Sequence, residues 1–126
     1  MKSGLLGKSI AVIALCSISQ LSLADDASAA KTIAGIVEHL NHFPSAAEKE
    51  VLMVISGDSA NSAAVKSIAM AVHDMQHSAS ADAKAQLAVI AADQGVSDSI
   101  RSLAEIVSGI NHMPSADAKA KLQAMM

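Results

Sequence analysis

Histidine is the residue of this chain whose type and spacing are best suited to chemistry. The 126 residues include five histidines, but no tryptophan or tyrosine and only one phenylalanine. His73 and His77 are four residues apart, so on a helix both imidazole rings would face the same side and could bind one metal ion. His39 and His42 form a second closely spaced pair. These pairs raise the hypothesis of a transition metal site.

A repeat with a constant offset of 35 residues relates the histidines to one another. Lys-Thr-Ile-Ala at 31–34 returns as Lys-Ser-Ile-Ala at 66–69 and as Arg-Ser-Leu-Ala at 101–104. In this register His42, His77 and His112 are equivalent. A fixed period without insertions indicates that each unit is one supersecondary element that buries its apolar side against its neighbours.

The candidate metal ligands follow from stacking the first two units side by side. Stacking would gather His39, His42, His73, Asp74 and His77 into one patch. Imidazole is a good ligand for zinc, copper and nickel, so the cofactor under this hypothesis is a transition metal ion, with haem as a further alternative. A covalently attached c-type haem is excluded because the chain has no Cys-x-x-Cys-His motif.

The alternative, which we favour from sequence alone, gives the histidines a structural role and predicts no cofactor. His42, His77 and His112 recur at the expected C-terminal end of a helix, where a histidine can bond free carbonyls and interact with the helix dipole. Equivalent residues on stacked helices are expected about 8–10 Å apart, which disfavours three rings on one ion. In the third unit Ser108 and Gly109 replace the partner residues of the patch.

The apolar pattern predicts an all-α fold of three tandem helical hairpins, arranged as a short solenoid or a compact bundle. Each unit repeats apolar residues at spacings of three, four and seven, which mark one face of an α-helix. Ser45, Ser80 and Ser115 precede the second helix of each unit and are expected to cap it. The predicted helices are 25–41, 45–56, 61–77, 80–92, 96–111 and 115–125.

The first 24 residues are expected to be a signal peptide. Lys2 and Lys8 are followed by an apolar run, and Ala24 ends a segment typical of a signal-peptidase site. We therefore expect a periplasmic or secreted protein with one helical-repeat domain over 25–126, in units of about 27–60, 62–95 and 97–126. Lipidation at Cys16 is an alternative that Leu15 disfavours, since a small residue normally precedes a lipidated cysteine.

Charge and composition exclude several function classes. Residues 25–126 carry 7 basic and 12 acidic side chains, a net charge of about −5 (7 − 12), which argues against nucleic acid as a partner. No catalytic motif occurs and no membrane span is expected after removal of the signal peptide. The predicted function is an exported, non-catalytic module that binds a protein partner or itself, and the alternative is a periplasmic metal-binding protein.

Overall fold

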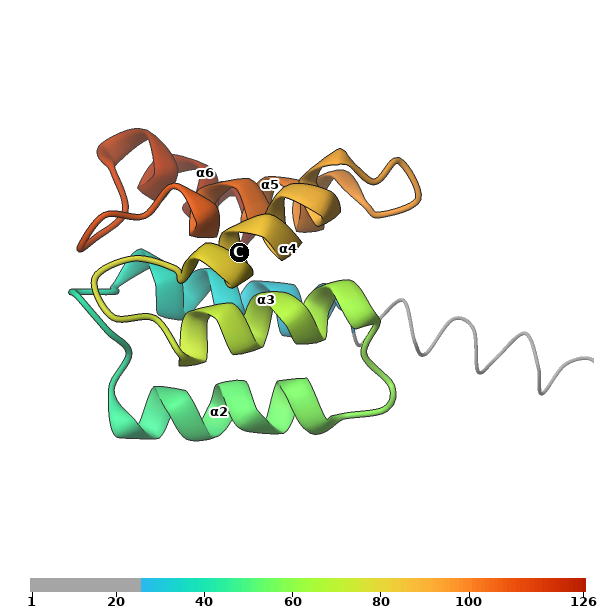
Figure 1. Cartoon of the computed structure of the whole chain (residues 1–126), viewed down its shortest axis with the longest axis horizontal. Helices are drawn as coiled ribbons and strands as arrows, with labels where there is room; N and C mark the ends of the chain where they lie inside the picture. The colour runs from blue at the N-terminus through green and yellow to red at the C-terminus, as the bar shows by residue number, and fades with distance from the viewer. Residues whose placement is uncertain (1–25) are drawn as a thin grey trace, which may run out of the picture.

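The structure is a computed structural model that describes residues 26–126, and helices are the regular elements of this part of the chain (Figure 1). The all-α prediction is therefore confirmed. The predicted signal peptide and Cys16 lie outside the described residues. The helices are an N-terminal helix over 26–38, α2 (Ala46–Gly57), α3 (Ala63–His73), α4 (Ala81–Ala92), α5 (Asp98–Ser108) and α6 (Ala116–Met125).

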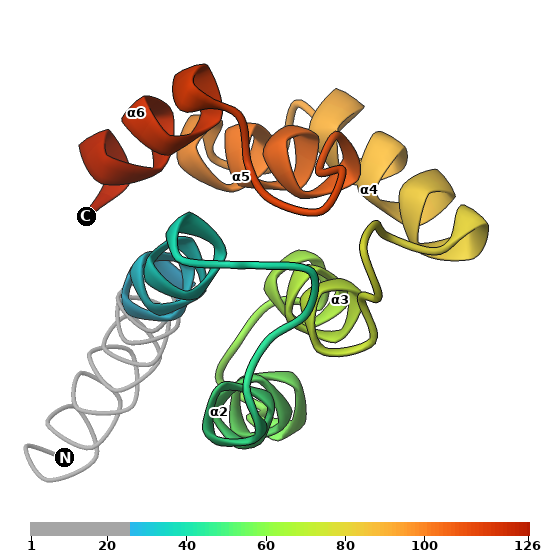
Figure 2. The ribbon, with the colours of Figure 1, turned by 90° about the vertical axis from the view of Figure 1, so that its left-hand side faces the viewer.

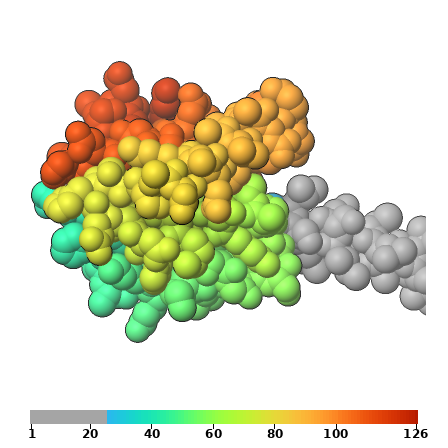
Figure 3. Space-filling model, viewed as in Figure 1, coloured from blue at the N-terminus to red at the C-terminus, as the bar shows by residue number. Residues whose placement is uncertain are grey.

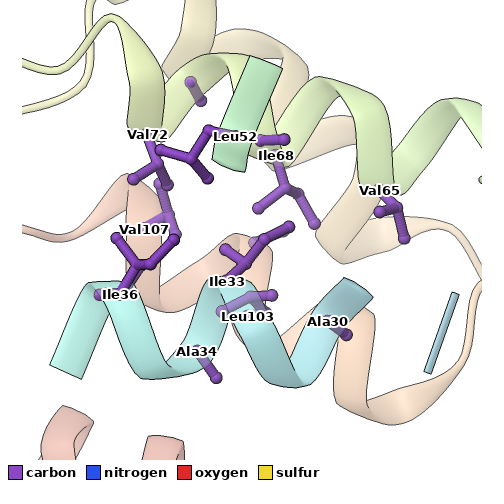
Figure 4. Packing of buried hydrophobic residues seen from close by; sticks show 14 of the residues in the cluster. Ala30, Ile33, Ala34, Ile36, Leu52, Val65, Ile68, Val72, Leu103 and Val107 are labelled. Carbon is purple, nitrogen blue, oxygen red and sulfur yellow. The ribbon is translucent and has the colours of Figure 1, made fainter. Parts of the chain in front are cut away.

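The repeated apolar positions form the core. Residues at equivalent positions in the three units are 0–3% exposed. Figure 4 shows side chains of the N-terminal helix, α2, α3 and α5 meeting in this core. The buried columns are Ile33, Ile68 and Leu103; Val37, Val72 and Val107; Leu40, Met75 and Ile110; and Leu52, Leu87 and Leu122.

The second helix of each unit begins where its serine predicts. The hydroxyl oxygens of Ser45, Ser80 and Ser115 each accept a hydrogen bond from the backbone N–H three residues later. Glu48 completes a capping box at Ser45, because its side chain accepts from the Ser45 N–H at 2.8 Å. The serine oxygens thus satisfy backbone donors that a helix start otherwise leaves free.

The first helix of each unit ends three or four residues earlier than predicted. We expected these helices to reach 41, 77 and 111, but they end at 38, His73 and Ser108. Leu40, Met75 and Ile110 keep their buried positions although they lie beyond the helix ends. The apolar pattern therefore extends beyond the last helical turn of each of these helices, and the residues after that turn belong to connecting loops.

The six helices of residues 26–126 form a ring of two layers. Viewed from one end, the N-terminal helix, α3 and α5 lie inside, and α2, α4 and α6 lie outside (Figure 2). Each outer helix lies between two inner helices. The contact of α2 with the following inner helix, α3, and that of α4 with α5 are the more extensive ones. The contacts of α4 with α3 and of α6 with α5, each with the inner helix that precedes it, are smaller. Among α2 to α6, the most extensive helix contacts therefore join one unit to the next.

The last helix closes the ring against the first. Gln123 Nε2 on α6 donates to Glu38 Oε1 on the N-terminal helix at 3.1 Å. A Cβ added at Gly35 would lie 3.5 Å from the Met126 sulfur, so the end of the chain packs on the N-terminal helix. Of the two predicted arrangements, the structure has the compact bundle.

On the face seen in Figure 3, α3 and α4 lie between the first and third units.

No helix in the described region combines the length and apolar character that a membrane crossing requires.

Candidate metal centre

Three equivalent loops meet at one end of the ring. We call residues 40–44, 75–79 and 110–114 the histidine loops; each joins an inner helix to the outer helix of the same unit (Figure 1). The three inner helices run parallel to one another, so the loops that follow them lie at the same end of the ring (Figure 1). The middle residue of each loop is a histidine: His42, His77 or His112, which together we call the histidine triad.

The backbone of the triad is left-handed. The φ angles are 75° at His42, 70° at His77 and 72° at His112, and these are the positive-φ residues among those described. Residues other than glycine adopt this conformation in only a few per cent of cases, because the Cβ atom then approaches the carbonyl oxygen; asparagine, aspartate and histidine are the most frequent of them. Three histidines in an unfavourable conformation indicate that the surrounding structure compensates for its cost.

A closed cycle of backbone hydrogen bonds provides part of this compensation. The His77 N–H donates to the His42 carbonyl oxygen at 2.7 Å, and the His112 N–H donates to the His77 carbonyl oxygen at 2.5 Å. The His42 N–H donates to the His112 carbonyl oxygen, also at 2.5 Å. Each triad residue thus donates one bond and accepts one, and the cycle joins all three units.

The cycle brings the three imidazole rings together. The ring centroid of His42 lies 5.0 Å from that of His77 and 5.0 Å from that of His112, and the centroids of His77 and His112 are 4.9 Å apart. One ring nitrogen of each histidine lies within 4.8 Å of the corresponding atoms of the other two. His77 and His112 are exposed and His42 is partly buried, so the cluster is accessible from solvent.

Two asparagines orient the rings. His42 Nδ1 lies 2.6 Å from Asn41 Oδ1, and His112 Nδ1 lies 2.7 Å from Asn111 Oδ1. Since a carbonyl oxygen only accepts, the tautomer that satisfies these contacts has its proton on Nδ1, which donates, and has the Nε2 lone pair free. Histidines that bind metals through one nitrogen usually donate from the other in this way.

The predicted spacing of the triad was wrong. We expected equivalent histidines at least about 8–10 Å apart, since that is the distance between packed helix axes. The rings are instead about 5 Å apart because His42, His77 and His112 lie on loops that converge beyond the helix ends. The predicted bonds from these rings to helix carbonyls are also replaced, at His42 and His112, by bonds to asparagine side chains.

The structure separates the other candidate ligands from the triad. His42 and His77 are the two predicted ligands that it brings together, and their partner His112 had been assigned only a structural role. His39, directly after the N-terminal helix, has its Nδ1 3.0 Å from the Gly35 carbonyl oxygen. His73 Nδ1 lies 2.7 Å from Asp74 Oδ1. The recurrence of histidine every 35 residues was the signal that pointed to His112. Side-by-side stacking of the repeat units did not predict that the three imidazole rings would converge.

The donor set suits a borderline transition metal. The triad offers three imidazole nitrogens, and no carboxylate or thiol belongs to the cluster among the residues described. Zinc, cobalt, nickel and copper favour such nitrogen ligands, whereas calcium and magnesium require oxygen. Zinc in a tetrahedral site binds imidazole at about 2.0–2.1 Å, which places the nitrogens about 3.3 Å apart. Moderate rotations of the imidazole rings would reduce the distances between the ring nitrogens, which are now up to 4.8 Å, to this value.

A cavity of about 550 Å³ lies at the opposite end of the inner helices, near their N-termini. Its lining is mostly apolar and includes Ala30, Ile100 and Met125. Asp26 reaches this region, but its carboxylate already accepts a hydrogen bond from the Ser62 N–H at 2.8 Å. Ser62 and Ser97 in this lining cap α3 and α5, whereas the triad brings three potential ligands together, so the triad is the stronger candidate site.

We compared the chain with protein-family models, curated protein sequences and solved structures, and none of the three comparisons gave a match.

Proposed function

We propose that this protein binds one divalent transition metal ion, with zinc as the reference ion, through His42, His77 and His112. The observation that supports the proposal most directly is the convergence of three imidazoles, one from each unit, within 4.8 Å. If residues 1–24 act as a signal peptide, the protein would perform this role in the periplasm or outside the cell.

The backbone conformation favours a role for the imidazoles themselves. Glycine or asparagine would adopt the positive φ of these positions at lower cost than histidine. Histidine at all three positions therefore supports a role for the side chain in addition to the shape of the loop. Unfavourable backbone conformations concentrate at functional sites, where the side chain supplies the advantage.

The architecture also favours metal binding over separate capping roles. Because the cycle of backbone bonds fixes the three Cα atoms, the rings are held close together before any ion arrives. Asn41 and Asn111 further orient two of the rings through their Nδ1 atoms. A site organised in advance loses less conformational entropy when the ligand binds.

Calorimetric titration of the chelator-treated protein with zinc tests the proposal. We expect one zinc ion per chain in the unaltered protein and no binding at this stoichiometry in a His77→Asn variant, since asparagine suits the left-handed backbone but removes the ring. His73→Asn is the matched control, because His73 lies outside the triad and should leave zinc binding unchanged.

The proposal is overturned if the unaltered protein takes up no zinc. It is equally overturned if His77→Asn binds zinc as the unaltered protein does, or if His73→Asn abolishes binding. Circular dichroism of each variant would establish that helix content is retained, so that a loss of binding reports on the ligand and not on the fold.

Self-association is a second candidate function, supported by two apolar side chains on the outer layer. Val54 on α2 and Val89 on α4 occupy equivalent positions and are 71% and 70% exposed. Sedimentation over a range of protein concentrations would test it. We expect a concentration-dependent dimer that is lost in a Val54→Ser/Val89→Ser variant, and a monomer at all concentrations would reject this function.

A further inference from the structure

We infer that the metal bound by the histidine triad keeps one open coordination position, which binds a small monodentate anion from solution in exchange for water. This inference rests on the proposed metal binding and goes beyond it, because it assigns the site an external ligand.

The number of protein donors supports the open position. In the part of the chain that the structure describes, His42, His77 and His112 form a cluster of three potential ligands with no fourth histidine, cysteine or carboxylate. Zinc and cobalt prefer at least four ligands, and sites with three protein ligands complete their shell with water or substrate. The fourth ligand must therefore come from outside the triad.

The charge of the site favours an anion. The histidine loops over 40–44, 75–79 and 110–114 contain no aspartate, glutamate, lysine or arginine. Three neutral imidazoles leave the full charge of a divalent ion uncompensated. An anion that replaces the bound water would neutralise part of this charge, whereas a cationic or neutral ligand would not.

The exposure of the cluster provides access. His77 and His112 are exposed, and so are the residues that follow His42 and His112 in their loops. Phe43 is 57% exposed and Met113 is 48% exposed. An ion held by the triad would thus lie next to solvent, which gives small ligands access to it.

Met113 is the internal group most able to compete for the fourth position. It is the sulfur donor directly after His112, and thioethers are ligands for Cu(I). Zinc(II) and cobalt(II) bind nitrogen and oxygen donors in preference to a neutral thioether, so we expect Met113 to stay uncoordinated with these ions. The experiment below therefore uses cobalt and includes a variant at this residue.

The test is a titration of the full, cobalt-loaded protein with sodium azide, followed by the visible absorption of the metal. We expect an intense absorption of four-coordinate cobalt(II), and a saturable spectral change corresponding to one azide per cobalt. Met113→Leu should show the same azide dissociation constant within about twofold, since its sulfur is not a ligand. Chloride at constant ionic strength should compete with azide, as expected for an exchangeable position.

The outcomes separate the inference from the function on which it rests. A cobalt spectrum that azide does not alter would overturn the open position while leaving metal binding intact. Azide binding only in Met113→Leu would show that Met113 fills the fourth position and would overturn the inference as well. Failure of the unaltered protein to bind cobalt at all would reject the proposed metal site itself, and the inference with it.

Discussion

The backbone N–H of His42 donates to the carbonyl oxygen of His112, which joins the first repeat unit directly to the last. The bonds from His77 to His42 and from His112 to His77 connect consecutive units, and an open stack of repeats could form them too. The bond between His42 and His112 requires that the units return on themselves. It therefore ties the geometry of the candidate metal site to the closure of the ring.

The left-handed backbone at His77 predicts unequal effects of two substitutions. His77→Asn should change the free energy of unfolding by less than about 0.5 kcal/mol, because asparagine tolerates a φ of 70°. His77→Val should lower it by about 1–2 kcal/mol, because a β-branched side chain is strongly disfavoured in this conformation. Urea denaturation in the presence of chelator measures both, and equal effects of the two substitutions would contradict the assigned backbone.

Closure of the ring predicts that the last helix is as firmly packed as its equivalents. Leu122 on α6 is 0% exposed and Leu87 on α4 is 1% exposed. We expect Leu122→Ala and Leu87→Ala each to lower the free energy of unfolding by about 2–5 kcal/mol, the usual cost of a cavity in a core. The exposed Val54 provides a control, since Val54→Ala should stay within about 0.5 kcal/mol.

The comparison of the two leucine variants distinguishes a closed ring from an open one. If Leu87→Ala is destabilising but Leu122→Ala costs less than about 1 kcal/mol, then α6 does not pack on the N-terminal helix as the structure describes. Denaturation curves of the two variants, measured under the same conditions, are sufficient for this test.

Gly35 is a helical glycine that predicts a stabilising substitution. It lies inside the N-terminal helix, and a Cβ at this position would meet the Met126 sulfur at 3.5 Å, an ordinary van der Waals contact. Gly35→Ala should raise the free energy of unfolding by about 0.5–1 kcal/mol, because alanine loses less backbone entropy in a helix. A lower melting temperature in this variant would indicate that α6 approaches the N-terminal helix more closely than described.

Metal binding should stabilise the fold, because the triad draws one ligand from each unit. At free zinc one hundred times the dissociation constant, the expected gain is about 2.7 kcal/mol. Acid should remove this gain, since protons compete with the metal for the imidazole nitrogens and the bound ion is released as the pH falls. Thermal melts with and without zinc at neutral and acidic pH measure the effect, and His77→Asn should show no zinc-dependent shift at either pH.

Local patterns in the sequence predicted that the fold is helical, where three of its helices begin, and which columns are buried. The serines at 45, 80 and 115 predicted where three helices begin, and the leucines at 52, 87 and 122 predicted core positions, because capping and amphipathic periodicity depend on residues a few positions apart. The 35-residue period also made His42, His77 and His112 equivalent. Capping and helical periodicity are local relationships, and the period is a comparison of the sequence with itself, so neither requires knowledge of how the units pack.

The way in which the three units meet could not be predicted from the sequence. The angle between successive units depends on how each outer helix packs against the next inner helix, a contact between residues distant in sequence that periodicity does not specify. That angle closes the ring after three units and brings the histidine loops to a common point. Sequence reasoning therefore gave His112 the same register as His42 and His77, but the folded ring placed their rings about 5 Å apart.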